Sequence, residues 1–196
     1  VEESNLNRQN YTEHDVFIKK AEAIKRRLLS INQDAQIEVH DCYIEQANIF
    51  EIIRGHEIAI NALDFSSDIP LVFDRMCQQE NVHILHPYNL GWGGLVTVIA
   101  PNGISLSTLQ KPGDEFNELN FVEYASGYLK FWGNPHPWID EIVQTYKEEP
   151  FQIPPPQLSI GSWSLASICT HILYLVCTGK EFKRFPDFYF SSIMES

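Results

Sequence analysis

Three charged residues in the first third of the chain are of the types that bind a phosphate and its counter-ion. Arg8 follows a polar cluster, Lys20 lies early in a predicted helix, and Asp64 ends a predicted strand. Arginine and lysine neutralise phosphate charge, and a carboxylate holds Mg²⁺ through its oxygens. In an α/β sheet the three could converge on one phosphate. Each also has an ordinary structural explanation, because a lone Arg or Lys is usually a solvated charge and an Asp after a strand is often a helix cap.

The segment that carries Lys20 has the pattern of an amphipathic helix over residues 14–32. Its apolar residues recur at alternating spacings of four and three and therefore share one face, while most of its basic residues lie elsewhere. Residues 36–40 alternate in the manner of a strand. The following stretch, "EQANIFEIIRG", predicts a short helix that ends at Gly55.

Asp64 closes a compact apolar stretch, "HEIAINALD", which predicts a buried parallel strand. A helix over residues 68–79 follows, with Pro70 in its first turn, and then two strands, "NVHILHP" and "GLVTVIAPNG". This alternation predicts an α/β fold with a Rossmann-like, largely parallel sheet and helices on both faces. Ligands of such sheets bind beyond the carboxyl ends of the strands, which is where Asp64 lies.

The pattern changes after Gly103. Residues 119–148 are aromatic and helical, residues 153–157 ("IPPPQ") read as a stiff linker, and residues 158–178 form an apolar helix that ends before Gly179. We expect the last segment to return to the sheet. Two parts are therefore predicted: an α/β domain over residues 1–103, and a helical, aromatic extension over residues 104–196 that packs on the same domain.

The composition excludes several classes of protein. Hydrophobic residues make up 44% of the 196 residues and charged residues 20%, which is enough for a core without disulfides. A net charge of -12 argues against nucleic acid as a partner. The longest apolar run, Leu165 to Cys177, is interrupted by Ser, Cys, Thr and His, so we expect a buried helix and no membrane span.

Cysteine, histidine and glycine offer little further chemistry. The four cysteines contain no CxxC pair, so we expect no zinc, and scattered thiols are typical of a reducing cytosol. His83 and His86 flank a strand and are expected to be structural, since no HxxxH or HExxH spacing occurs. The "GWGG" stretch precedes a strand, so it predicts a loop or bulge and not a dinucleotide fingerprint.

The order of three stretches resembles a known family. "VEESNLNRQ", "KAEAIKRRLLSIN" and "HEIAINALD" are similar to the adenylating enzymes related to ThiF, HesA and MoeB, bacterial relatives of the ubiquitin-activating enzymes. The resemblance covers Val1 to about Ile99 and returns more weakly at "GSWSLASICTHILYLVCTGKEFKRFP". The family's glycine-rich phosphate loop would precede Val1, so the resemblance implies an N-terminally truncated domain that lacks its first β-α-β unit.

The resemblance also implies roles for individual residues. Asn5, Arg8 and Gln9 would contact the nucleotide, Lys20 the phosphates, and Asp64 would hold magnesium. Lys19 is an alternative to Lys20, and Phe17 stands where the family commonly has glycine.

The implied reaction is the ATP-dependent and Mg²⁺-dependent adenylation of a carboxylate, often the C-terminus of a ubiquitin-like or sulfur-carrier protein, or else a modified peptide. A cytoplasmic homodimer would carry it out. The alternative is a non-catalytic subunit of the same fold that acts as a dimer scaffold or binding module.

Overall fold

The computed structural model describes residues 1–65, 67–111, 113, 116–148 and 157–194. The chain divides into two compact units, residues 1–45 and residues 46–196. Each unit is described by itself below.

The N-terminal unit consists of short helices joined by turns. Two 3₁₀ turns, η1 (Glu3–Asn5) and η2 (Glu13–Asp15), precede the helix α1 (Lys20–Ile31). The predicted helix therefore begins at Lys20 and not at residue 14. The reason lies at Phe17, whose φ of 66° is left-handed and interrupts the helical path, and at Lys19, which is extended with a ψ of 134°.

The strand predicted over residues 36–40 is not formed. Residues 34–45 contain neither helix nor strand, and the four described strands pair only with one another. An alternating pattern becomes a strand only where a neighbour supplies backbone hydrogen bonds, and no described strand does so here.

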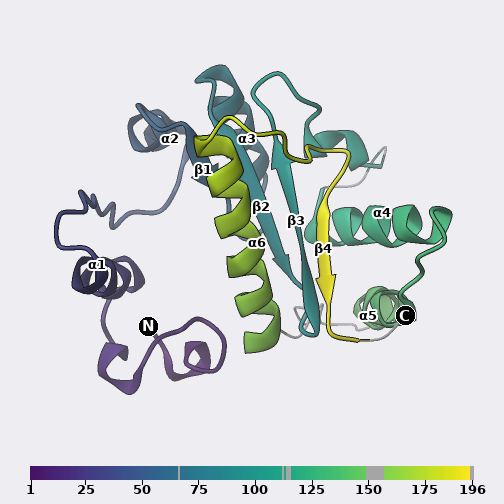
Figure 1. Cartoon of the computed structure of the whole chain (residues 1–196), viewed down its shortest axis with the longest axis horizontal. Helices are drawn as coiled ribbons and strands as arrows, with labels where there is room; N and C mark the ends of the chain where they lie inside the picture. The colour runs from purple at the N-terminus through teal and green to yellow at the C-terminus, as the bar shows by residue number, and fades with distance from the viewer. Residues whose placement is uncertain (66, 112, 114–115, 149–156, 195–196) are drawn as a thin grey trace. The chain divides into compact units, whose positions relative to one another are not determined.

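The C-terminal unit is built on a four-stranded sheet in the order β1-β2-β3-β4 (Figure 1). The strands are β1 (Ile58–Ile60), β2 (His83–Asn89), β3 (Gly93–Ile99) and β4 (Tyr189–Ser192). The α/β class is confirmed. The expectation of a largely parallel sheet is wrong for these strands, because only β1 and β2 are parallel, whereas β2–β3 and β3–β4 are antiparallel.

A tight turn causes this mixed pairing. Only Leu90, Gly91 and Trp92 separate β2 from β3, and a parallel connection needs a crossover of a dozen residues or more. Gly91 has a φ of 78°, which glycine adopts without strain. Only the first half of the "GWGG" stretch is therefore the predicted loop, because Gly93 and Gly94 already belong to β3.

Helices cover both faces of the sheet, as expected. On one face, α6 (Ser159–Cys177) packs its buried side against β2 and β3, in a core of Leu85, Val96, Val98, Leu165, Cys169 and Ile172. On the other face, α3 (Ile69–Gln79) contacts β2, and α4 (Glu118–Phe131) places Phe121 against Tyr88 of β2, with ring centroids 4.8 Å apart. Alternate strand residues point to opposite faces, which explains why β2 serves both layers.

The remaining helices complete the second unit. They are α2 (Gln46–Ile53), which ends before Gly55 as predicted, the short η3 (Leu106–Leu109), and α5 (Pro137–Glu148), which contacts α4. The aromatic region is therefore helical as expected, and the last segment returns to the sheet as β4. Most of the predicted linker, residues 153–156, lies outside the described residues.

The helix α6 is only partly the buried helix that its composition predicts. Its inner side lies on the sheet, but Trp163 is 63% exposed and Tyr174 is 54% exposed. By length and composition alone, α6 could cross a membrane, a property that core helices of soluble proteins share. Its packing against β2 and β3 accounts for its apolar inner side.

Candidate functional site

A buried polar side chain fixes the path of the chain from β1 to Asp64. The Asn61 backbone N–H donates to the carbonyl of Leu85 at 2.9 Å, which continues the β1–β2 pairing. Its side-chain amide donates to Asp74 Oδ1 at 2.9 Å and to the carbonyl of Pro70 at 3.0 Å. Its Oδ1 accepts the backbone N–H of Leu63 at 3.2 Å, so the turn is held up to the residue before Asp64.

Asp74 and His86 form the centre of this network. The Nε2 atom of His86 lies 2.9 Å from both carboxylate oxygens of Asp74, and the two residues are 1% and 0% exposed. Burying a charged group is costly unless a hydrogen-bonded partner accompanies it, so each residue needs the other. The pair ties α3 to β2 beneath the turn. His86 is thus structural, as the sequence predicts.

The residue after Asp64 anchors the turn from its other end. The ring of Phe65 lies 5.2 Å from that of Phe116 and 6.4 Å from that of His86, measured between centroids. Asp64 itself is exposed to solvent. The result is an exposed carboxylate on a turn that is held on both sides.

A second carboxylate lies close enough to Asp64 to feel its charge. Glu118 is the first residue of α4, and burial together with the charge of Asp64 raises its pKa above the ordinary value. A cation between the two carboxylates would relieve this repulsion. Mg²⁺ is usually held by one or two carboxylates together with waters and substrate phosphates, so Asp64 and Glu118 are the residues here that could hold it. In the described part of the chain, no three His, Cys, Asp or Glu residues gather as metal ligands.

In the N-terminal unit, the polar cluster folds into a tight turn around Asn5. Asn5 is buried, and its Oδ1 accepts the backbone N–H of Glu2 at 3.0 Å. Its carbonyl accepts the backbone N–H groups of Arg8 and Gln9 at 3.3 and 2.9 Å. The Arg8 guanidinium donates to the carbonyl of Ser4 and, at 3.2 Å, to Asn7 Oδ1. Asn5 thus holds the turn that carries Arg8 and Gln9.

The two adjacent lysines differ in their partners. Lys19 forms an ion pair with the carboxylate of Asp41. Lys20, the first residue of α1, is exposed and has no carboxylate partner among the residues that the structure describes. Lys20 is therefore the better placed of the two to meet a phosphate.

The structure thus groups four of the five predicted residues in one unit. Asn5, Arg8 and Gln9 share one turn, and Lys20 begins the helix of the same unit, whereas Asp64 belongs to the other unit. Their assembly into one site stays a prediction. Sequence reasoning missed Asn61, Asp74 and Glu118. A polar residue on the buried side of a predicted helix, as at Asp74, was the available signal.

Comparison with known proteins identifies a family and several similar sequences. Residues 1–149 match the model of the ThiF family. The chain is similar to the sulfur carrier protein ThiS adenylyltransferase of Bacillus subtilis (strain 168), with 36% identity over 104 residues that make up 52% of this chain and 31% of that protein. It is also similar to the SAMP-activating enzyme E1 of Haloferax volcanii, with 28% identity over 104 residues, 53% of this chain and 38% of that protein. The chain thus spans about a third of the length of these relatives.

Solved structures share the fold at low sequence identity. The crystal structure of E. coli MccB with MccA-N7isoASN superposes with a TM-score of 0.64 over 100% of this chain and 55% of that chain, at 15% identity. The crystal structure of PaaA gives a TM-score of 0.58 over 99% of this chain and 62% of that chain, at 16% identity. At such identities the likeness concerns the fold alone.

Proposed function

The chain belongs to the ThiF family, and we propose that it adenylates a carboxylate at the expense of ATP. The names of its relatives support this reaction, since one adenylates the sulfur carrier ThiS and another activates SAMP. We propose that the acceptor is likewise the C-terminus of a sulfur-carrier or ubiquitin-like protein. A homodimer in the cytoplasm belongs to the same proposal.

The observation that carries the proposal is the way in which Asp64 is held. It is an exposed carboxylate beyond the carboxyl end of β1, the region where open α/β sheets bind ligands. The hydrogen bonds of Asn61 and the ring of Phe65 fix the turn on either side of it. A carboxylate that served only to be hydrated at the surface would not need a turn fixed on both sides.

The proposed chemistry requires positive charge beside the phosphates. A carboxylate oxygen of the acceptor attacks the α-phosphorus of ATP and pyrophosphate leaves, so negative charge gathers on the phosphate oxygens. We assign the neutralisation of this charge to Arg8 and Lys20, and nucleotide contacts to Asn5 and Gln9. Asp64 would hold Mg²⁺, which when bound supplies further positive charge to the phosphates.

Exchange of pyrophosphate into ATP tests the proposal. The full-length protein, incubated with ATP, Mg²⁺ and a sulfur-carrier protein with a free C-terminus, should incorporate labelled pyrophosphate. Asp64→Asn should abolish most of the exchange, whereas Asp34→Asn, an equal change of charge at an exposed turn, should leave it unchanged. Absence of exchange with every carrier would favour a non-catalytic scaffold.

A further inference from the structure

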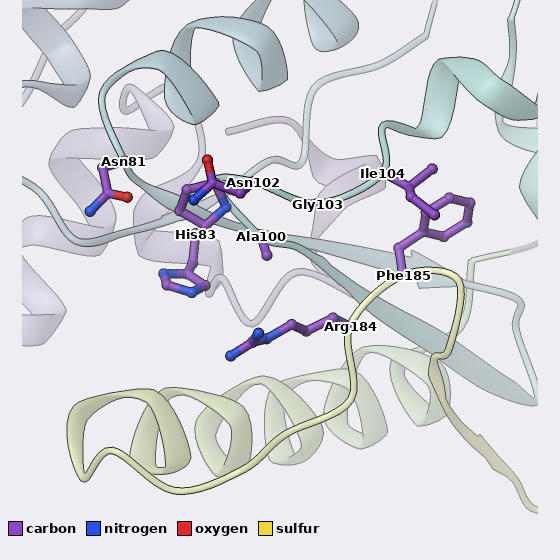
Figure 2. A pocket seen from close by; sticks show the side chains of 9 residues that line it. Asn81, His83, Ala100, Asn102, Gly103, Ile104, Arg184 and Phe185 are labelled. Carbon is purple, nitrogen blue, oxygen red and sulfur yellow. The ribbon is translucent and has the colours of Figure 1, made fainter.

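An open hollow of about 380 Å³ lies at one edge of the sheet in the C-terminal unit (Figure 2). His83, which lines it, is the first residue of β2 and pairs in register with Ile58, the first residue of the parallel strand β1. Asp64 follows the opposite end of β1. The hollow is therefore separate from the carboxyl edge of the sheet and goes beyond the proposed function.

Two basic side chains meet at this hollow without an acidic one. Figure 2 shows the guanidinium of Arg184 below the imidazole of His83, one from the segment after α6 and the other from β2. Among the residues that the structure describes, no Asp or Glu lines the hollow, and Arg184 takes part in none of the ion pairs. In a chain with a net charge of -12, two neighbouring basic groups without a carboxylate are unusual.

The two basic groups are held in place by one aromatic ring. The guanidinium carbon of Arg184 lies 4.8 Å from the centroid of the Phe182 ring, and the His83 ring meets the same ring at 5.6 Å between centroids. A guanidinium stacked in this way keeps its planar fork free to bind two oxygens of one anion. Burial, and then the charge of Arg184, lowers the pKa of His83.

The walls of the hollow are fixed by hydrogen bonds. The Gln78 side-chain amide donates to the carbonyls of Ala100 and Gly103 at 2.9 and 3.1 Å, which ties α3 to the turn after β3. The backbone N–H of Phe185 donates to the carbonyl of Val98 at 2.9 Å, which ties the segment of Arg184 to the sheet. The hollow is thus a preformed feature of the fold, of a size that suits a small ligand.

We propose that this hollow binds a small organic oxyanion, whose charged end meets Arg184 and His83. The side chains of Asn81 and Asn102 offer hydrogen bonds at its rim, and Ile104 and Phe185 provide an apolar wall for the ligand's body. Phosphate monoesters and carboxylates share this chemistry. Binding should raise the pKa of His83, because a nearby anion favours the imidazolium. The groups that face this ring are Arg184, Phe182 and the backbone of Glu57.

NMR titration of the whole chain tests the proposal, with the His83 ring resonances as the reporter. Phenyl phosphate, benzoate and inorganic phosphate serve as separate probes, and no ATP or carrier protein is present, so failure of the proposed adenylation leaves the test intact. We expect saturable shifts of His83 with phenyl phosphate or benzoate. The probe that binds more tightly identifies the anionic group as phosphoryl or carboxylate.

Two variants decide whether Arg184 carries the binding. Arg184→Gln should weaken binding about tenfold or more, since it removes a charged hydrogen-bond donor. Arg75→Gln makes the same change at an exposed position of α3 and should leave the affinity unchanged. Shifts that stay linear up to high probe concentration, or that are equal in Arg184→Gln and the parent, would overturn the proposal. Unaltered resonances of buried His86 would show that Arg184→Gln is folded.

Discussion

The two units of this chain hold their candidate residues by different means. In the N-terminal unit, Asn5 and Ala23 are the buried residues, and the candidate residues lie on a tight turn and at a helix start. In the C-terminal unit, Asp64 follows β1 on a turn that the side chain of Asn61 ties to the buried pair of Asp74 and His86. The first unit is therefore expected to tolerate substitution with little loss of stability, and the second to tolerate almost none beneath Asp64.

The largest expected effect comes from breaking the buried pair of the C-terminal unit. His86→Ala removes the ring that contacts both carboxylate oxygens of Asp74 and leaves the buried carboxylate with the Asn61 amide alone, which should lower the free energy of unfolding by about 3–5 kcal/mol. Urea denaturation followed by circular dichroism measures this loss. Replacing His86 and Asp74 together by Leu should restore part of it, because no buried charge then remains, whereas the buried Asn61 amide loses one of its two acceptors. If His86→Ala were as stable as the parent, the C-terminal unit would not depend on its buried pair.

Next in size is the effect of Asp64 on catalysis. Asp64→Asn keeps the shape of the side chain and should reduce pyrophosphate exchange by about 100-fold, a typical loss for one electrostatic group. The free energy of unfolding should hardly change, since Asp64 is exposed. If Asp64→Asn lowered the free energy of unfolding substantially as well as the rate of exchange, the loss of exchange would be explained by unfolding.

In the N-terminal unit, the two adjacent lysines offer a matched pair of variants. Lys20→Gln should lower pyrophosphate exchange about tenfold or more, because in the proposed site the ammonium of Lys20 neutralises phosphate charge. Lys19→Gln should lose only the exposed ion pair with Asp41, which contributes about 0–1 kcal/mol to stability. Exchange rates and denaturation curves of both variants check this. The reverse result would assign the phosphate contact to Lys19.

A pH titration tests whether the carboxylates of Asp64 and Glu118 interact. Burial and the charge of Asp64 raise the pKa of Glu118, so the folded state binds its proton more readily than the unfolded chain. This contribution to stability is present below the ordinary carboxyl pKa and is lost as the pH rises through the raised pKa. Carbon-detected NMR should show a lower Glu118 pKa in Asp64→Asn and, in the parent, on addition of Mg²⁺. No response to Mg²⁺ would exclude Glu118 from the neighbourhood of the ion.

The smallest expected effect concerns the backbone at Phe17. A φ of 66° strains a bulky side chain, and this one is 96% exposed, so packing does not compensate. Phe17→Gly should therefore stabilise the N-terminal unit by about 0.5–1 kcal/mol. Hydrogen exchange of the amides of α1 would detect the change. Faster exchange in the variant would show that the ring has a partner after all.

Local pattern predicted most helices of the C-terminal unit, because their periodicity and their Gly and Pro signals lie within one segment. It did not predict the direction of strand pairing. That direction follows from the short turn at Gly91 and from β4, which is nearly a hundred residues away from β3 in sequence. The strand over residues 36–40 failed for the same reason, since pairing requires a neighbour that a local pattern does not contain.

In the candidate site, too, the sequence identified single residues but not the contacts between distant segments. Arg8, Lys20 and Asp64 could be selected from their residue types and positions in the sequence, whereas the nearness of Glu118 to Asp64 follows only from the folded structure. Asn61 and Asp74 support the site through a network between a strand and a helix. Their polarity is plain in the sequence, but their partners are not.

The pairing of β3 with β4 has a consequence for synthesis. Every residue of β3 is buried in the finished fold, yet its outer neighbour is supplied by Tyr189–Ser192, which is synthesised long after β3. Until then β3 is a bare, apolar sheet edge, the kind of surface that recruits strands from other chains. The helix α6 and β4 are thus the closing piece of the sheet, and a nascent chain that has not yet received them is the form most in need of a chaperone.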